Sequence, residues 1–209
     1  MHLHGFAETK LEVRRRKGGG LHLAGKFPYG KLAVLSSGGR TGRPQKESIE
    51  PHAFRYRVEQ VDADIHLLVG HDFNRPMANK LGQTLRLNDT ESALEFEADI
   101  SDQMMEVGYV REAMLQFGAG LVGGISPGFT IPPKRTVENA VTYEDEGHDP
   151  ERGMHNAQIR RVHEAILYEL SLVTVPAYDE TQLTMRGWKP ERDQAIAPKP
   201  FGNDIHRWR

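Results

Sequence analysis

Alternation of apolar and polar residues along the chain predicts a protein built mainly from β-strands. The clearest case is 94–100, where every second residue is apolar and the residues between them are acidic. This period of two is typical of an antiparallel strand with one buried face, and the apolar segment 85–87 is expected to complete a hairpin with it. Further strands are expected where short apolar runs meet glycine or proline, at 11–13, 21–25, 32–35, 65–69, 123–131 and 165–175. We expect the first three of these to be hairpins joined by glycine clusters, and 65–69 to be packed on both faces.

One segment spaces its apolar residues for a helix instead. These residues are Val107, Val110, Met114, Phe117 and Leu121. Their spacing predicts an amphipathic helix of about four turns that ends near 118–120 and packs on the sheet. Ser101 is expected to cap its start, because a serine oxygen accepts a hydrogen bond from a free backbone N–H group there. The polar segment 132–158 is expected to form a long surface loop, and 38–44 a mobile one.

These elements favour an α+β fold with a mostly antiparallel, β-barrel-like core and packed helices. A length of 209 residues, with 38% hydrophobic residues and 21 glycines, suits one large domain with a sizeable core. We expect this domain to span 11–185, after a flexible N-terminal arm at 1–10. Past Leu183 the composition shifts to glycine, proline and charge, which predicts a C-terminal tail at 186–209.

The absence of cysteine removes several classes of chemistry. Disulfide frameworks, thiolate metal sites and a cysteine nucleophile are excluded, so covalent catalysis would need another nucleophile. The first residues lack the basic flank and apolar core of a signal peptide, and no apolar run approaches the roughly 20 residues of a membrane span. The sequence therefore predicts a soluble protein made in the cytoplasm, with no membrane partner.

Charge is distributed unevenly along this chain, whose formal net charge is −2. The segment 1–57 carries 12 Lys or Arg against 4 Asp or Glu, whereas 58–151 carries 6 against 18. The four consecutive cations at 14–17 would attract a nucleic acid or an acidic protein at long range. A solvated strand end beside a glycine turn is the commoner explanation of such a run, so nucleic acid is not the expected partner.

Three polar residues stand in or at the ends of apolar strands: His71, Ser126 and Glu169. A carboxylate buried among apolar residues is costly unless it is hydrogen-bonded or paired, and a histidine is its natural partner. If His71 takes the proton of the Ser126 hydroxyl while Glu169 orients the imidazole, the three form a Ser-His-acid nucleophilic site. From the residues alone, purely structural roles for all three are the commoner explanation.

Three longer segments contain these residues. They are HDFNRPM at 71–77, GLVGGISPGFTI at 120–131 and YELSLVTVPA at 168–177. In order and spacing they resemble the three motifs of tailed-bacteriophage prohead proteases, which are capsid-maturation serine proteases with a fold similar to herpesvirus assemblin. The resemblance covers roughly 10–185, and EPHAF at 50–54 also resembles the opening part of this family.

The resemblance implies roles for the three polar residues. His71 would be the general base, Ser126 the nucleophile and Glu169 the orienting third member. Assemblin-like enzymes can use a second histidine in the third place, so His163 is an alternative to Glu169, and Asp72 is another because it lies beside the base.

Pro127 departs from the small or aliphatic residue expected after the serine. It removes one backbone N–H group next to the nucleophile, so an oxyanion hole must use other donors. The glycines whose backbone a substrate could approach closely are Gly123, Gly124 and Gly128.

The resemblance also implies a place and a partner. The enzyme would act inside the prohead, in the host cytoplasm, where it cleaves the scaffold protein or extensions of the major capsid protein, and itself. Assemblin forms dimers, so a homo-oligomer is the expected state. No cofactor is implied.

Two other functions compete with this interpretation. A metal hydrolase would use His148, His155 and His163 with the carboxylates Asp145, Glu146 and Asp149, but gaps of seven and eight residues between the histidines match no compact zinc pattern. The pair His2 and His4 fits an unstructured start better than a site. We therefore expect no metal. The second alternative is a catalytically inactive structural or scaffold component of the procapsid, because a fold does not fix a function.

Overall fold

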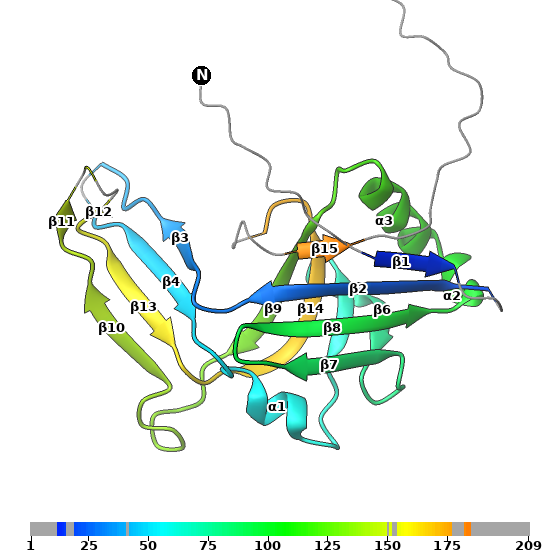
Figure 1. The fold of residues 1–209 in the computed structure, drawn as a ribbon, viewed down its shortest axis with the longest axis horizontal. Helices are drawn as coiled ribbons and strands as arrows, with labels where there is room; N and C mark the ends of the chain where they lie inside the picture. Colours follow the sequence, from blue (N-terminus) through cyan, green and yellow to red (C-terminus); the bar gives the residue numbers. More distant parts are fainter. Residues whose placement is uncertain are drawn as a thin grey trace, which may run out of the picture.

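Strands make up most of the structure, as the alternating pattern predicts. The computed structural model describes residues 12–15, 19–40, 42–149, 151, 154–176 and 182–184. Two of its sheets lie face to face, and a third extends to one side of them (Figure 1). The predicted arm at 1–10 and tail at 186–209 lie outside the described residues.

The first sheet has the strand order β1-β2-β8-β7, with β15 also paired to β2. Its strands are β1 (Glu12–Arg15), β2 (Leu21–Pro28), β7 (Leu85–Asp89), β8 (Ala93–Ile100) and β15 (Gln182–Thr184). Strands β7 and β8 form the predicted antiparallel hairpin. The four apolar residues of 94–100 are at most 2% exposed, while the two glutamates between them face solvent. The face that the sequence marked as apolar is therefore the buried one.

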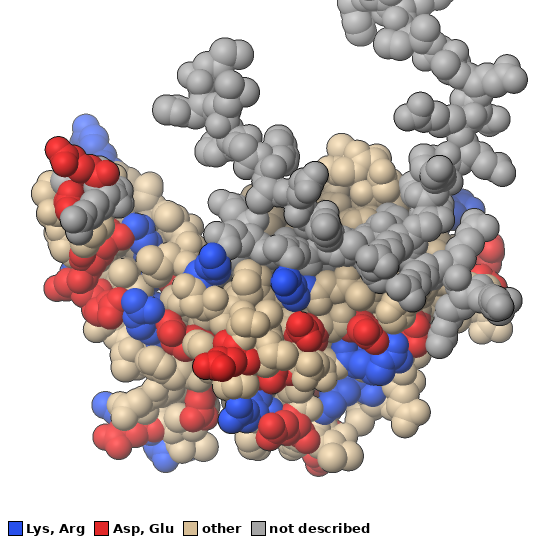
Figure 2. Space-filling view, viewed as in Figure 1, with Lys and Arg blue, Asp and Glu red and all other residues tan. Residues whose placement is uncertain are grey.

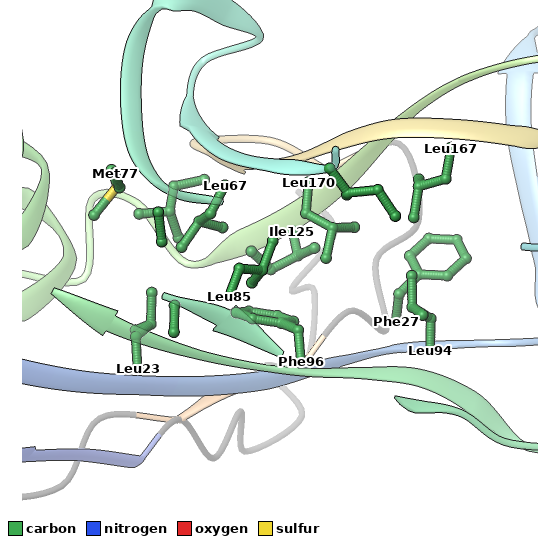
Figure 3. Close-up of a cluster of buried hydrophobic side chains, with 14 of the residues drawn as sticks. Leu23, Phe27, Leu67, Met77, Leu85, Leu94, Phe96, Ile125, Leu167 and Leu170 are labelled. Atoms are coloured by element: carbon green, nitrogen blue, oxygen red, sulfur yellow. The ribbon is translucent and has the colours of Figure 1, made fainter. Parts of the chain in front are cut away.

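The second sheet has the order β6-β5-β14-β9. Its strands are β5 (His66–Val69), β6 (Asp72–Asn79), β9 (Gly124–Thr130) and β14 (Ile166–Val173). Leu67, Ile125 and Leu170 on its inner face meet Leu85 and Phe96 of the first sheet in the hydrophobic core (Figure 3). Neighbouring residues of β5 are both fully buried, so this strand is covered on both faces, as predicted.

The third sheet corrects two predictions, and its order is β10-β13-β4-β3. Its strands are β3 (Leu32–Ser36), β4 (Gln45–Ile49), β10 (Val141–Asp145) and β13 (Gln158–Val162), and the short pair β11 (His148–Asp149) and β12 (Met154–His155) extends it. The prediction of a long loop at 132–158 is therefore wrong. So is a hairpin between β2 and β3, because β3 pairs with β4 instead.

Charged side chains explain why this sheet leaves a weak pattern in the sequence. The Arg161 guanidinium donates hydrogen bonds of 2.9 Å to Glu144 on β10 and to Glu50 just after β4. Long ion-paired side chains thus cover positions that an ordinary half-buried strand fills with apolar residues. The alternation on which strand prediction depends is lost.

The predicted helix is present but interrupted. Ser101 caps α2 (Asp102–Met105), because its hydroxyl accepts a hydrogen bond from the Met104 N–H group at 3.2 Å. The chain then turns through an extended Val107 and continues as α3 (Gly108–Gly118), which packs against β5 and β6. The remaining helix is the short α1 (Arg55–Glu59). Leu121, expected on the apolar face, lies past the helix end and is exposed.

The fold is mostly antiparallel, but the sheets described here stay open and close no barrel. Two pairings are parallel: β5 with β14, and β4 with β13. The predicted barrel-like closure is thus replaced by sheets packed on one another (Figure 1). Within the described part of the chain, no helix is long and apolar enough to cross a membrane.

The unequal charges of the sequence are mixed in space. Figure 2 shows acidic and basic side chains interspersed over the face that the first and third sheets present. Cross-strand ion pairs account for part of this mixing, such as Arg86 with Glu97 and Asp99. The side chains of the basic run 14–17 lie outside the part of the chain that the structure describes.

Candidate active site

His71 stands in the tight turn between β5 and β6. Val69 pairs with Asp72, so Gly70 and His71 form a two-residue connection, and both have positive φ angles, 65° and 60°. Such turns suit glycine and asparagine, whereas a left-handed backbone costs other residues roughly 1–2 kcal/mol. Local propensity thus disfavours a histidine here, and strained residues of this kind cluster at functional sites.

Glu169 lies on β14 next to this turn. It is 3% exposed, and its Oε1 lies 2.7 Å from Nδ1 of His71. A carboxylate can only accept, so Nδ1 carries the proton and donates it to this bond. In the neutral imidazole, Nε2 is then left with a free lone pair, which is the form a general base needs.

Ser171, two residues further along β14, binds both groups. Its hydroxyl donates a hydrogen bond to Oε2 of Glu169 at 2.6 Å and accepts one from the backbone N–H of His71 at 2.9 Å. Sequence reasoning missed this residue, although it stands in the segment YELSLVTVPA. The available signal was its spacing, because residues i and i+2 of a strand share a face.

Ser126 lies on β9, the other neighbour of β14. It pairs directly with Ser171, and Gly128 pairs with Glu169. Directly paired residues point to the same face of a sheet, so Ser126 shares the face of the carboxylate. Its side chain is half-buried, and among the described residues no hydrogen bond joins it to His71.

Gly128 makes room for the carboxylate. A Cβ atom added at this position would lie 1.9 Å from Oε1 of Glu169, far inside van der Waals contact. The carboxylate thus leans over β9, two residues from Ser126. The His71 ring is bonded to this same oxygen, Oε1, on the sheet face that Ser126 shares.

The two alternatives for the third member make other contacts. Asp72 accepts hydrogen bonds from Asn74 through Oδ1 and faces Arg75 through Oδ2. His163 lies beside the third sheet, where its Nε2 is 2.8 Å from Oγ1 of Thr142. Among the described contacts, neither reaches the His71 ring.

The histidines of the alternative metal site are dispersed. His148 pairs with His155 across β11 and β12, while His163 contacts Thr142. Among the described residues, no three histidines or carboxylates form a group that could hold a metal ion. His2 and His4 lie outside the described residues.

The segment EPHAF at 50–54 has a structural environment. Nδ1 of His52 lies 3.2 Å from Oδ1 of Asp89, which also accepts the Tyr29 hydroxyl at 3.1 Å. Burial raises the pKa of the Asp89 carboxyl and, together with the nearby carboxylate, that of the Tyr29 phenol. The backbone carbonyl of Ala53 accepts a hydrogen bond from the N–H group of Ala165, the residue before β14. This segment therefore anchors the strand that carries Glu169.

Comparison with known proteins identifies a family for this chain. The family model described as caudovirus prohead serine protease matches residues 34–193. This range covers most of the chain and contains His71, Ser126 and Glu169. Neither a curated protein nor a solved structure gives a significant match. On the strength of the family match, the chain belongs to the caudovirus prohead serine proteases.

Proposed function

We propose that this protein is a serine endopeptidase that cleaves scaffold or capsid-protein extensions inside the prohead, and also itself. The family implies a serine peptidase that acts in capsid maturation within the host cell. The observation that carries the proposal for this chain is the 2.7 Å bond between His71 and the buried Glu169. The proposal is also supported by the position of this pair, which lies on the sheet face that carries Ser126.

The proposed reaction follows serine-protease chemistry. Nε2 of His71 takes the hydroxyl proton as Oγ of Ser126 attacks the carbonyl carbon of the scissile peptide bond. His71 then gives that proton to the leaving amine, and an acyl-enzyme on Ser126 remains. Water, deprotonated by the same nitrogen, releases the acid product and restores the serine. Glu169 holds the Nδ1–H tautomer throughout and stabilises the imidazolium.

Replacing Glu169 with glutamine is expected to lower kcat about 10²-fold. Glutamine keeps an oxygen that can accept from Nδ1, and its amide can donate to the Ser171 oxygen, so the geometry is conserved while the charge is lost. The measurement is the rate of cleavage of the capsid or scaffold protein by Glu169→Gln, beside a thermal unfolding curve that checks the fold.

The matched controls are Asp72→Asn and His163→Ala. Both remove an alternative third member, and both are expected to cleave at the wild-type rate. If one of them loses activity while Glu169→Gln retains it, the third role passes to that residue.

The first test of the proposed function is the intact mass of the purified protein over time, beside that of Ser126→Ala. Terminal fragments lost by the wild type alone would support a self-processing serine protease and reveal the cleavage sites. If both masses stay constant, each variant is co-expressed with the capsid and scaffold proteins of its phage. Cleavage of these by the wild type only is the expected result.

The absence of a bond between Ser126 and His71 favours a second candidate, an inactive structural component of the procapsid. Pro127 favours it too, because the residue after the serine has no N–H group for an oxyanion. Catalytic hydrogen bonds in ligand-free sites are often long and shorten only around substrate, so we rank this candidate second. Uncut capsid and scaffold proteins in the co-expression would establish it.

A further inference from the structure

We propose that Ser171 is a positioning residue that holds the carboxylate and the base of this site in register, an inference that rests on the proposed serine-protease function. Its hydroxyl bonds to Oε2 of Glu169 at 2.6 Å and to the backbone N–H of His71 at 2.9 Å. One side chain thus holds two members of the site. The reaction steps themselves do not use it.

The first bond fixes the orientation of the carboxylate. Glu169 is 3% exposed, and of its two oxygens one faces His71 and the other Ser171. Without the hydroxyl, Oε2 would keep its charge in a buried place with no donor, which is unfavourable. The carboxylate would rotate toward other donors or water, and that rotation would move Oε1 away from Nδ1.

The second bond fixes the turn. The N–H group of His71 belongs to a residue with a positive φ of 60°, a conformation that persists only where the surroundings enforce it. The Ser171 oxygen is its acceptor. The hydroxyl therefore restrains both the partner of the imidazole and the backbone from which the imidazole projects.

Serine suits this position because of its size and its hydrogen-bonding capacity. One hydroxyl has one donor and two acceptor lone pairs, enough for both bonds at once. The side chain is fully buried, so both of its hydrogen bonds must be made within the protein. Alanine can make neither bond, and cysteine makes both only weakly.

The kinetic test compares Ser171→Ala with a matched control elsewhere in the chain. Ser48 is also fully buried, and its hydroxyl donates to a glutamate two residues away, Glu50, at 2.8 Å. We expect Ser171→Ala to lower kcat by about tenfold to 10²-fold with little change in KM, because misplacing a reacting group costs this much. Ser48→Ala is expected to lose stability by a similar amount but to keep the wild-type kcat. Ser171→Thr, which retains the hydroxyl, is expected to recover part of the rate.

A spectroscopic readout separates this inference from the proposed function. The Nδ1 proton of His71, bonded to a carboxylate, is followed by proton NMR in a Ser126→Ala background, where no cleavage can occur. We expect its downfield signal to be present with Ser171, broadened or lost in Ser171→Ala, and unchanged in Ser48→Ala. If Ser171→Ala does not fold, Ser171→Cys takes its place and a weakened signal is expected.

An unchanged Nδ1 proton signal in the Ser171 variants would overturn the positioning role, whatever the activity of the wild type. Failure of the proposed function would look different. The wild type would then leave every substrate uncut, while the signal would still report whether Ser171 holds the pair together.

Discussion

Replacing Ser126 with alanine is expected to lower kcat/KM for cleavage by about 10⁴-fold or more, because the acyl-enzyme no longer forms. His71→Ala is expected to give a loss of the same order, and the double variant hardly more, since members of such a site act as one unit. The measurement is the initial rate of cleavage of a peptide that spans a mapped processing site. The fold of Ser126→Ala should be intact, because its hydroxyl has no hydrogen-bond partner among the described residues.

The stability of the two single variants offers a control on this interpretation. His71→Ala leaves the buried Glu169 without the donor to Oε1, so it should unfold at lower denaturant concentration than Ser126→Ala. Full activity of Ser126→Ala would assign the nucleophile to another residue. Losses that simply multiply in the double variant would show that the two side chains act independently.

Gly128→Ala is expected to lower kcat/KM by about 10³-fold although it adds only one methyl group. The reason is that this methyl group would displace the Glu169 carboxylate, which orients His71. The Cβ would lie 1.9 Å from Oε1 of Glu169, so the carboxylate must move. It would then leave both His71 and Ser171, which removes the charge, the tautomer control and the orientation together. Glutamine at position 169 removes only the charge, so its effect should be the smaller one.

Gly123→Ala is the matched control for this prediction. It lies in the same glycine-rich segment, three residues before Ser126, and a Cβ there would meet nothing within 4 Å. We expect it to cleave at close to the wild-type rate in the same peptide assay. A Gly128→Ala enzyme as active as Gly123→Ala would mean that the bond between His71 and Glu169 is dispensable.

Strand prediction succeeded for β8, β9 and β14, which are confirmed close to their expected bounds. In β8 the burial of one face imposes the period of two, whereas β9 and β14 lie in apolar runs bounded by glycine or proline. Strand prediction failed for β4, β6, β10 and β13. Ion-paired side chains cover the third sheet, and β6 contains Pro76 and four exposed residues in a row, so neither shows the pattern.

The site was accessible to sequence reasoning only in part. A buried carboxylate requires a partner, which pointed from Glu169 to a histidine, and the family motifs pointed to the same three residues. Ser171 and Gly128 were not found as parts of it. The spacing of Ser171, two residues after Glu169 on the same strand, was the available signal, whereas the relation of Gly128 to Glu169 depends on the register between β9 and β14. The catalytic roles themselves remain predictions.

The central position of β14 has a consequence for biosynthesis. The strands that carry Ser126 and lead to His71 are not neighbours, since each pairs with β14 between them. A ribosome must therefore release the chain past Val173 before β5 and β9 can be joined, and such distant pairings close late in folding. A chain shortened before this strand holds the base and the serine but lacks the element that unites them. The proposed site can therefore assemble only after β14 has been synthesised.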